Sequence, residues 1–438
     1  MQFTRNLMRV PYTVGRWVRG EQHYGRQRLL NLLLTAPDNE YWVVGTRRMG
    51  KSSLLRQLEM MTDSHDHYVP LLCDLQGCQT TQDLATELVF AIEDASQRFA
   101  QLGITPETLR DLGAIEILRT LQRAAADQGK QLLLLIDEAE ALIHVAEQEG
   151  NWLARLRRVF QDHRQRTVIT ATKMLLRLND MQSDWMTSPF LFGFILVNLW
   201  SLDDPAATAL VQQAQTAFPV RVEPELLTEI LYYTNRHPYL MQYLCQRLYV
   251  SDGENAWLRA VEEEDLIPDH LLTNFLAIDF NHLSVLERRI LLTVNERQAV
   301  SQLDLVGLLS NDAPTRIHTF AYGLYKLGYI RRTGDLWAIS NEYLARWLRE
   351  NSSELKQVMS SQLDEPLLEQ MIVQGVNQER AYLDAEMRAL TRMLAELDAV
   401  HVDSAGRELA DLQRKIADVR RELDEANRQL RLLSSGSQ

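Results

Sequence analysis

The amino-acid sequence predicts an α/β protein with a parallel sheet flanked by helices, followed by a helical lid, a winged helix and a C-terminal α-helical coiled coil. Over residues 1–200, short apolar runs alternate with amphipathic stretches, as in a parallel sheet with crossover helices. Residues 201–280 and 281–350 keep helical periodicity, and the second range ends in a hairpin signal. Residues 351–438 repeat apolar side chains at heptad spacing, which is typical of a coiled coil.

The first region supplies the strands of the predicted sheet. Strands are expected over residues 40–44, 68–75, 131–136, 167–171 and 194–199, and helices over 51–59 and 81–102. The run LLLLI at 132–136 is continuously apolar. Such a run suits a central parallel strand that is covered by helices on both faces.

The composition is that of a globular protein with several domains. The chain has 438 residues, of which 46% are hydrophobic and 24% are charged. The net charge of −13 argues against a protein that mainly coats nucleic acid. No apolar run approaches the roughly 18 residues of a membrane span, so no membrane partner is expected. The three cysteines lack the spacing of a disulfide framework or a zinc site, which favours a reducing, cytoplasmic location.

The region after residue 200 is expected to be largely helical. Apolar residues recur every three to four positions over 205–278, which predicts the lid. Residues 283–348 then give three helices and a β-hairpin with its turn at Thr333, Gly334 and Asp335. This order of elements predicts a winged helix.

Two heptad helices are predicted in the C-terminal region. The apolar positions 383, 387, 390, 394 and 397 are spaced 4, 3, 4, 3, and a second set from 409 to 430 alternates 3 and 4. The segment HVDSAGR at 401–407 separates them, and Asp403 or Ser404 is a candidate cap for the second helix. An antiparallel hairpin and an intermolecular coiled coil are both compatible with this pattern.

A phosphate-binding loop is predicted between the first strand and the helix after it. Residues 45–52 fit the pattern G-x-x-x-x-G-K-[ST] at every fixed position, which indicates a P-loop NTPase. In such a loop the backbone N–H groups point at the phosphates, Lys51 reaches the β and γ phosphates, and Ser52 binds Mg²⁺. The alternative is a glycine-rich turn without a ligand. The expected ligands are ATP and Mg²⁺, bound by Gly45, Thr46, Arg47, Arg48, Met49, Gly50, Lys51, Ser52 and Ser53.

Two acids at the end of the 131–136 strand are the candidates for metal binding and water activation. Asp137 is expected to share the Mg²⁺ with Ser52, because a Walker B acid ends a strand beside the P-loop. Glu138 is expected to orient and deprotonate the attacking water, assisted by Lys51 as the second catalytic group. The alternative is that both acids only solvate the strand end.

Over about residues 10–350 the sequence resembles the archaeal-type ATPases of the STAND class, which are relatives of AAA+ and origin-recognition ATPases. The similar segments are PYTVG at 11–15, Tyr24-Gly25-Arg26, GTRRMGKSSLL at 45–55 and CDLQG at 73–77. In that family the first two segments lie against the adenine, so the resemblance implies nucleotide contacts for Tyr24, Gly25 and Arg26.

The resemblance extends to a sensor strand and to the lid. VITATK at 168–173 looks like a sensor 1 segment, which implies that Lys173 senses the γ-phosphate; a solvent-facing lysine is the alternative. TNRHPYL at 234–240 is similar to the lid motif GGHPYL, whose proline, here Pro238, packs on the base. Asn235 and Arg236 stand where that motif has glycines. The family's winged helix folds back on the nucleotide and separates on activation.

Two functions follow from these features. The first is an ATP-driven molecular switch that binds a protein partner or another copy of itself through residues 365–433. The second is an origin-recognition-like ATPase that binds DNA through the winged helix. Its candidate contacts are Thr315, Arg316, His318, Tyr322, Lys326, Arg331 and Arg332. Residues 282–350 carry nine basic and seven acidic side chains, so DNA is the less favoured partner.

Overall fold

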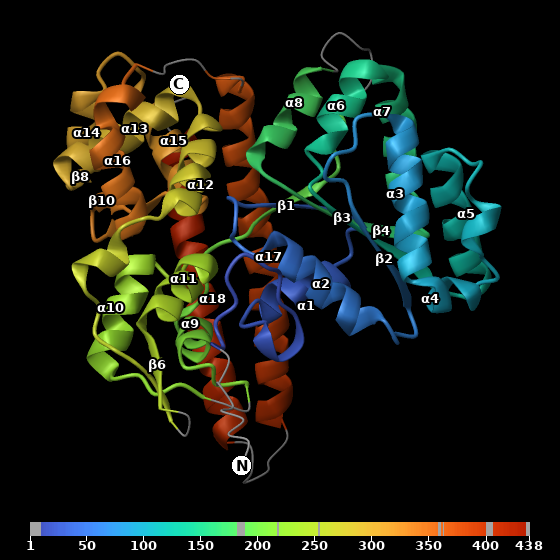
Figure 1. The fold of residues 1–438 in the computed structure, drawn as a ribbon, viewed down its shortest axis with the longest axis horizontal. Coiled ribbons are helices and arrows are strands. Elements are labelled where there is room, and N and C mark those ends of the chain that lie inside the picture. Colours follow the sequence, from blue (N-terminus) through green and yellow to red (C-terminus); the bar gives the residue numbers. More distant parts are fainter. Residues whose placement is uncertain are drawn as a thin grey trace, which may run out of the picture.

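The computed structural model describes residues 10–181, 189–216, 219–252, 255–357, 361, 363–399 and 406–434. A sheet domain occupies one side of the molecule, and a lid and a small helical domain are stacked on the other (Figure 1). Two long helices run side by side between these halves (Figure 1). No described helix combines the length and the apolar composition that a membrane span requires.

The sheet domain contains the five predicted parallel strands. They are β1 (Glu40–Val44), β2 (Tyr68–Asp74), β3 (Gln131–Asp137), β4 (Gln165–Ala171) and β5 (Ile195–Asn198). Their order is β2-β3-β4-β1-β5. β3 and β4 are buried along almost their whole length, which confirms that the apolar run at 132–136 is central. The predicted α/β fold is therefore confirmed.

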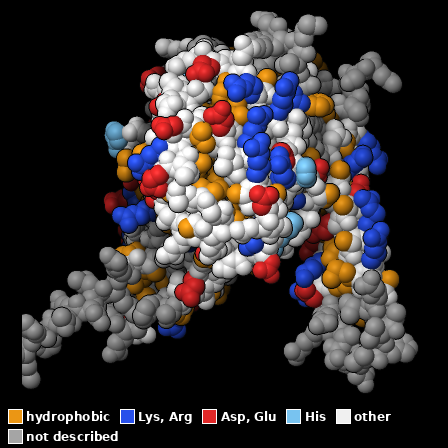
Figure 2. Space-filling view, turned by 90° about the vertical axis from the view of Figure 1, so that its right-hand side faces the viewer, with side chains coloured by type: hydrophobic (Ala, Val, Ile, Leu, Met, Phe, Trp, Pro, Cys, Tyr) orange, Lys and Arg blue, Asp and Glu red, His pale blue; other side chains and the backbone are white. Residues whose placement is uncertain are grey.

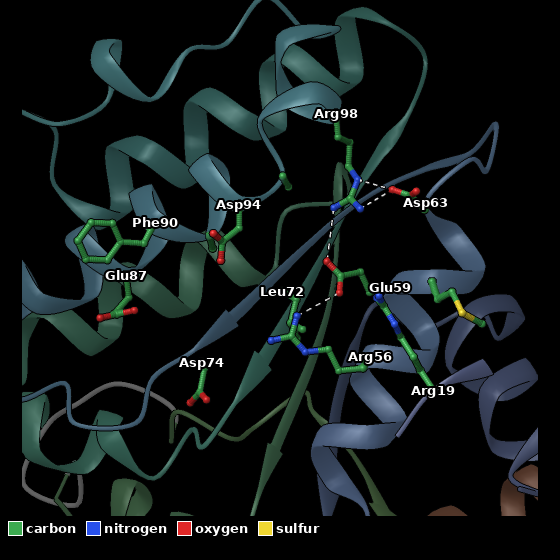
Figure 3. Close-up of a pocket in the computed structure, with 13 residues that line it drawn as sticks. Arg19, Arg56, Glu59, Asp63, Leu72, Asp74, Glu87, Phe90, Asp94 and Arg98 are labelled. Carbon is green, nitrogen blue, oxygen red and sulfur yellow. Dashed lines mark hydrogen bonds and ion pairs between the residues drawn. The ribbon is translucent and has the colours of Figure 1, made fainter. Parts of the chain in front are cut away.

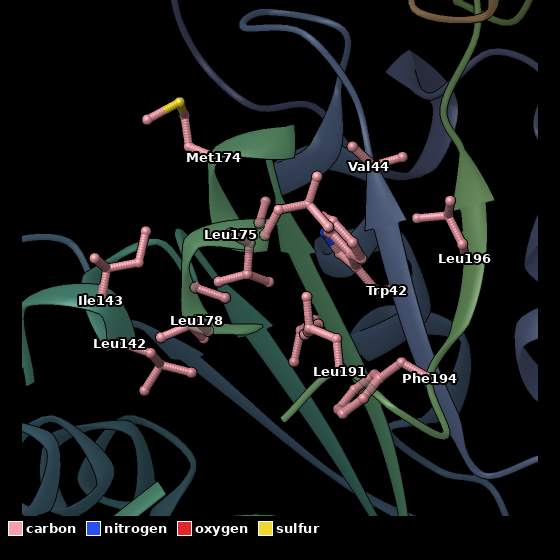
Figure 4. Close-up of a cluster of buried hydrophobic side chains, with 14 of the residues drawn as sticks. Trp42, Val44, Leu142, Ile143, Met174, Leu175, Leu178, Leu191, Phe194 and Leu196 are labelled. Atoms are coloured by element: carbon pink, nitrogen blue, oxygen red, sulfur yellow. The ribbon is translucent and has the colours of Figure 1, made fainter. Parts of the chain in front are cut away.

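Helices cover both faces of this sheet. On one face, α1 (Gln27–Thr35) and α2 (Lys51–Thr62) pack against Tyr41, Val43 and Leu135. The other face is covered by α3 (Thr81–Asp94), α5 (Ala114–Asp127), α6 (Ala141–Gln148) and α7 (Gly150–Phe160). Figure 4 shows Trp42 of β1 within this second cluster, near Leu191 and Leu175. The outer side of this layer carries many Lys and Arg side chains (Figure 2).

The predicted helix over 81–102 is interrupted. It consists of α3 and the short helix α4 (Ser96–Ala100), because Ala95 leaves helical geometry at φ −104° and ψ 26°. Thr80 and Asp83 form a capping box that fixes the start of α3. The break lets α4 turn toward the edge of the sheet, where Arg98 contacts β2.

The lid and the winged helix follow the sheet domain. The lid contains α9 (Asp204–Val211), α10 (Pro224–Thr234), α11 (Pro238–Leu248), α12 (His270–Asn281) and the short strands β6 (Tyr249–Ser251) and β7 (Ala256–Leu258). The winged helix contains α13 (Val285–Arg297), β8 (Ala299–Ser301), α14 (Gln302–Leu308), α15 (Pro314–Lys326), β9 (Ile330–Thr333), β10 (Leu336–Ile339) and α16 (Glu342–Leu355). The sequence pattern missed β8, because a strand of three residues is too short to show alternation.

The C-terminal helices form a hairpin within the chain. They are α17 (Glu365–Ala399) and α18 (Gly406–Ser434), and Leu383 of α17 forms a buried cluster with Val419 and Ala426 of α18 where they meet. Of the two arrangements that the heptads allow, the described residues adopt the hairpin. The candidate caps Asp403 and Ser404 lie outside the described residues.

Helix α17 packs between the sheet domain and the winged helix. A Cβ at Gly323 of α15 would lie 2.5 Å from Ile372 Cδ1, so any larger residue here would force the Ile372 side chain to shift. A Cβ at Gly375 of α17 would similarly lie 2.9 Å from Leu196 Cδ2 of β5. The amide oxygen of Gln378 accepts a 2.6 Å hydrogen bond from the N–H of Leu196. The hairpin therefore contacts both halves of the molecule.

Candidate nucleotide-binding site

The predicted phosphate loop has the expected backbone path. It leaves β1 at Gly45, whose N–H donates to the carbonyl of Ala171 at 3.3 Å. Arg48 (φ 62°) and Gly50 (φ 99°) both adopt left-handed conformations that curl the loop. The N–H of Leu54 donates to the carbonyl of Gly50 at 2.9 Å, which starts α2. This strand, turn and helix expose backbone N–H groups at a helix N-terminus, as anion binding requires.

The lysine and serines of the loop have different partners. The buried Lys51 ammonium donates to the carbonyls of Gly45 (3.1 Å) and Thr46 (3.2 Å), so it lies inside the loop. Ser52 is half-buried in the first turn of α2. The hydroxyl of Ser53 accepts a 3.1 Å hydrogen bond from the N–H of Val18. In this arrangement Ser53 holds the N-terminal segment against the loop.

Asp137 and Glu138 stand at the carboxyl end of β3. The Asp137 carboxylate accepts from the hydroxyl of Thr170 (2.5 Å) and from the N–H of Glu138 (3.1 Å), which fixes its orientation. Glu138 has φ 50°, a conformation that costs energy for a residue other than glycine. Burial raises the pKa of Glu138, as does Glu140, while the nearby Lys51 opposes this rise. These charges place Glu138 and the loop lysine in one site.

Lys173 lies at the end of β4 and is not exposed to solvent. Only 4% of its side chain is exposed, and its ammonium donates to the carboxylate of Glu287, which is fully buried in α13. The alternative of a solvent-facing lysine is therefore wrong. Burial lowers the pKa of Lys173, and Glu287 opposes that shift. The candidate sensor is thus bound to the winged helix in this arrangement.

Asp279 is a lid residue that faces the phosphate loop, and no sequence pattern indicated it as a site residue. Its carboxylate lies 3.9 Å from the guanidinium Nε of Arg47. Burial raises the pKa of Asp279 to about 6, although Lys51 and Arg47 both act to lower it. Periodicity marks Asp279 only as a residue of an amphipathic helix, and its position in the site comes from the docking of α12.

The residues implied to lie near the base form a junction between the loop and the lid. The buried Tyr24 precedes Gly25, where a Cβ would lie only 2.6 Å from Ala206 Cβ of α9. The guanidinium of Arg26 donates to the carbonyls of Met49 (3.4 Å) and Ser201 (3.5 Å). The N-terminal segment therefore connects the phosphate loop with the lid.

The lid turn forms without the glycines of the motif that it resembles. Asn235 and Arg236 both adopt left-handed conformations, with φ 47° and 56°. The carbonyl of Arg236 accepts from the N–H of Leu202 at 3.0 Å, and Pro238 begins α11. Burial and the positive charge of Arg26 lower the pKa of His237 to about 4. The turn thus brings His237 and Pro238 to the same junction as Arg26.

Most of the predicted DNA-contacting residues contact the C-terminal hairpin. Arg316 pairs with Glu365 at 2.7 Å, Lys326 with Glu379 at 2.6 Å, and Arg332 with Glu425 at 3.0 Å. His318 contacts the amide oxygen of Gln429 at 3.0 Å, Tyr322 is buried, and Arg331 donates to the carbonyl of Tyr232 at 3.1 Å. Thr315 lies in the first turn of the same helix. Acidic side chains of the hairpin therefore neutralise most of this basic surface.

Comparison with known proteins identifies the sheet domain. Residues 39–179 match the family model described as an AAA domain, a segment that contains the phosphate loop, Asp137, Glu138 and Lys173. No curated protein sequence matches the chain significantly. Residues 39–179 thus form an AAA-type P-loop ATPase domain.

Among solved structures, the fold resembles the Walker-type ATPase of Pyrococcus abyssi. That similarity has a TM-score of 0.54 at 18% identity and covers 77% of this chain and 99% of that one. The ORC2 protein of Aeropyrum pernix matches with a TM-score of 0.43 at 14% identity, over 76% of this chain and 93% of that one. RuvB of Thermotoga maritima gives 0.36 at 15% identity, over 78% and 96%. At 18% identity, the similarity to the Pyrococcus abyssi protein concerns the fold alone.

Proposed function

We propose that this protein is a Mg²⁺-dependent, ATP-hydrolysing molecular switch of the STAND type. Its nucleotide state sets the position of the winged helix, and the C-terminal hairpin passes that state to a protein partner or to another copy of the chain. The proposal rests on an AAA-type ATPase domain whose candidate site is in contact with the lid and the winged helix.

The residues of the site fit ATP and Mg²⁺ chemically. Ser52 and Asp137 offer a hydroxyl and a carboxylate oxygen, which are ligands that Mg²⁺ prefers, and the bound ion would neutralise charge on the phosphates. Lys51 is placed to stabilise charge on the β and γ phosphates. Glu138 would take a proton from a water whose oxygen bonds to the γ-phosphorus, while the bond from that phosphorus to the bridging oxygen breaks. Its raised pKa suits a base working near neutral pH.

The Lys173–Glu287 pair is the observation that carries the switch. Both groups are buried, so the ammonium can serve Glu287 or a γ-phosphate but not both at full strength. Asp279 similarly lies close to Arg47, a second cation of the loop. A triphosphate would compete with two carboxylates, one from the lid and one from the winged helix. Nucleotide binding is therefore linked to the release of these two elements.

The space beside the loop supports the same conclusion. The cavity enclosed by the loop, the lid and the winged helix has a volume of about 50 Å³. Ligand pockets usually occupy roughly 300–1,000 Å³. Arg48 lies 4.3 Å from the centre of the Phe275 ring, which closes the cavity further. A nucleotide base and sugar on this side of the loop would require α12 and the winged helix to move.

A single ammonium group connects this movement to the hairpin. Lys326 of α15 lies 3.7 Å from the ring centre of Trp200, which follows β5, and it bonds to Glu379 of α17 at 2.6 Å. The sheet domain, the winged helix and the hairpin thus meet at one buried side chain. Displacement of the winged helix would break these contacts together, which gives the hairpin a way to respond to the nucleotide.

DNA binding through the winged helix is the second candidate function. The geometry of helix α15 and the β9–β10 wing favours it, since this is the arrangement that enters a major groove. The hairpin contacts of Arg316, Lys326 and Arg332 weigh against it in this arrangement. The switch is therefore the preferred proposal.

Distance measurement by pulsed electron spin resonance tests the switch. Spin labels at Gln82→Cys in α3 and Leu303→Cys in α14 report the separation of the sheet domain and the winged helix. Both positions are exposed, and all three native cysteines are buried. We expect different distance distributions with ADP and with a non-hydrolysable ATP analogue. Identical distributions at saturating concentrations of both nucleotides would overturn the switch while leaving the ATPase domain intact.

A further inference from the structure

Strand β2 forms an edge of the sheet and opens on its free side into a cavity. Among the described residues, β2 pairs with β3 and with no other strand. The cavity has a volume of about 550 Å³ and lies between α2 and α3, with Leu72 and Asp74 of β2 along its floor (Figure 3). It is separate from the nucleotide site, because its lining includes none of the loop residues 45–52.

Part of the backbone of β2 is free to bond to another strand. The carbonyl of His67 and the N–H of Leu75 both bond to β3, at 2.8 and 3.1 Å, so the odd-numbered residues of β2 face β3. The even-numbered residues therefore turn their N–H and C=O groups to the free edge. Pro70 has no N–H, and its carbonyl accepts from Arg98 at 2.7 Å. Arg98 thus caps the first half of the edge, and Leu72 and Asp74 stay open.

The wall formed by α3 is acidic and carries an exposed aromatic ring. Glu87, Phe90 and Asp94 line the cavity from this helix (Figure 3), and Phe90 is 51% exposed. Among the residues that the structure describes, neither these two acids nor Asp74 forms an ion pair. Burial and the negative charge of Asp74 raise the pKa of Glu87. This wall therefore suits a cationic side chain.

The opposite wall is formed by α2 and is different in character. Its acids are already neutralised, since Glu59 contacts Arg56 at 3.4 Å and Asp63 is paired with Arg98. Met60 is 40% exposed at the same wall. The side chain of Leu72 packs toward α2 rather than toward α3. Arg19 and Arg56 also line this side, so the wall disfavours a cationic side chain and leaves Met60 and Leu72 to contact an apolar one.

We propose that this cavity binds an extended peptide segment of a partner protein, which adds to β2 as a sixth strand. Its backbone bonds to Leu72 and Asp74. Successive side chains of a strand point to opposite faces. Lys or Arg side chains therefore lie toward Glu87, Phe90 and Asp94, and apolar side chains lie toward Met60. Strand addition of this kind takes its affinity from backbone bonds and its specificity from alternate side chains.

Charge distinguishes this partner from a second copy of the chain. Pairing of β2 with the same strand of another molecule would bring two acidic walls together, and like charges disfavour that contact. An alternating basic and apolar segment matches both walls at once. The occupant is therefore a basic peptide strand.

Fluorescence anisotropy with a labelled peptide of sequence TKVRVKT tests the proposal on the 438-residue protein. The Glu87→Lys/Asp94→Lys variant should weaken binding about tenfold, as the loss of two charged contacts predicts. The control Glu107→Lys/Asp111→Lys reverses two exposed acids of the same domain outside the cavity and should change affinity less than about twofold. Nucleotide binding, measured in parallel, should be unchanged in both variants.

Backbone pairing has its own signature. N-methylation of alternate amides of the peptide should abolish binding for one set and leave the other set near the unmodified affinity, because only one set faces β2. Hydrogen exchange in residues 68–75 should slow when the peptide binds. The proposal is overturned if the peptide fails to bind at millimolar concentration, if both charge variants behave alike, if both methylated sets bind equally, or if peptide binding follows self-association of the chain.

Discussion

The ammonium group of Lys173 donates a hydrogen bond to the carboxylate of Glu287, which lies 114 residues further along the chain. Glu287 also forms the capping box of α13 with Ser284, so the winged helix starts at the point where it contacts the ATPase domain. Both side chains of the pair are buried. It therefore holds the two domains together at the place where a nucleotide would act.

Breaking the Lys173–Glu287 pair should destabilise the docked winged helix. Lys173→Met and Glu287→Gln each leave one buried group without its ionic partner, which typically costs about 3 kcal/mol. The double variant should lose clearly less than the sum of the two single variants. Urea unfolding followed by tryptophan fluorescence measures this cycle. Additive losses would show that the two side chains do not interact in solution.

Asp279 should make stability depend on pH. Burial raises the pKa of its carboxyl from an ordinary 3.8 to about 6, so the folded protein binds this proton more tightly than the unfolded chain. The stabilisation that this carboxyl group contributes is therefore fully present below about pH 4. The free energy of unfolding then falls by about 3 kcal/mol as the pH rises from 4 to 6. Asp279→Asn should remove that loss and be more stable than the parent protein at pH 7.

The comparison with Asp279→Asn is needed because other groups titrate in the same range. Burial lowers the pKa values of His23, His237 and His282 to about 4. The stability that these three neutral histidines contribute is therefore lost as the pH falls. Subtracting the two unfolding profiles isolates the carboxyl. A difference between the profiles that stays constant from pH 4 to 7 would contradict this account of Asp279.

Glu138→Gln should retain ATP and lose turnover. The amide keeps the size of the side chain but cannot accept a proton, so the rate of hydrolysis should fall about 100- to 10,000-fold. Phosphate release and nucleotide binding are measured separately, with Glu140→Gln as the matched neighbour. Burial raises the pKa of Glu138, so as the pH falls its carboxylate is protonated at a higher pH than that of an ordinary glutamate. The activity of the parent protein should therefore begin to decline at that higher pH. Normal hydrolysis by Glu138→Gln would exclude this residue as the base.

Gly323→Ala should weaken the packing of helix α17 of the hairpin against α15. The added Cβ would lie 2.5 Å from Ile372 Cδ1, and overpacking of this kind costs about 1–3 kcal/mol. Gly307→Ala is the control, because its Cβ would meet no atom within 4 Å and alanine favours a helix by about 1 kcal/mol. Thermal unfolding should therefore move in opposite directions for the two variants. Ile372→Ala in the Gly323→Ala background should recover part of the loss, and no recovery would place the defect elsewhere.

The 438-residue protein should not bind duplex DNA tightly at physiological salt. Arg316, Lys326 and Arg332 are paired with hairpin acids, and a typical site uses roughly 6–10 phosphate contacts. Gel-shift titration over a series of salt concentrations checks this expectation. Sequence-specific binding with a steep salt dependence would favour the DNA-binding candidate over the switch.

Local patterns were sufficient to predict most of the fold. The strands, the phosphate loop, the acids at the end of β3 and the heptad helices all depend on residues close together in the chain. The same holds for the winged helix, whose turn at Gly334 is visible in the sequence. Such features have a period or a spacing that a single segment reveals.

Contacts between domains could not be predicted in this way. The spacing of Ser284 and Glu287 is typical of a capping box, but no pattern in the neighbouring sequence indicates that the Glu287 carboxylate also contacts Lys173. Asp279 and Glu379 likewise become important only because α12 and α17 dock where they do. Heptad spacing allowed a hairpin or an intermolecular coil, and packing against β5 and α15 is a tertiary property that selects between them.

Isothermal titration of the protein with Mg²⁺ and ATP, alongside Lys51→Ala, tests directly whether this loop binds the nucleotide. We expect saturable binding near one nucleotide per chain for the parent protein and a loss of at least about tenfold in affinity for the variant, because the ammonium inside the loop is gone. Absence of saturable binding by the parent protein, or equal affinity in the two proteins, would contradict the assignment of this loop as the nucleotide site.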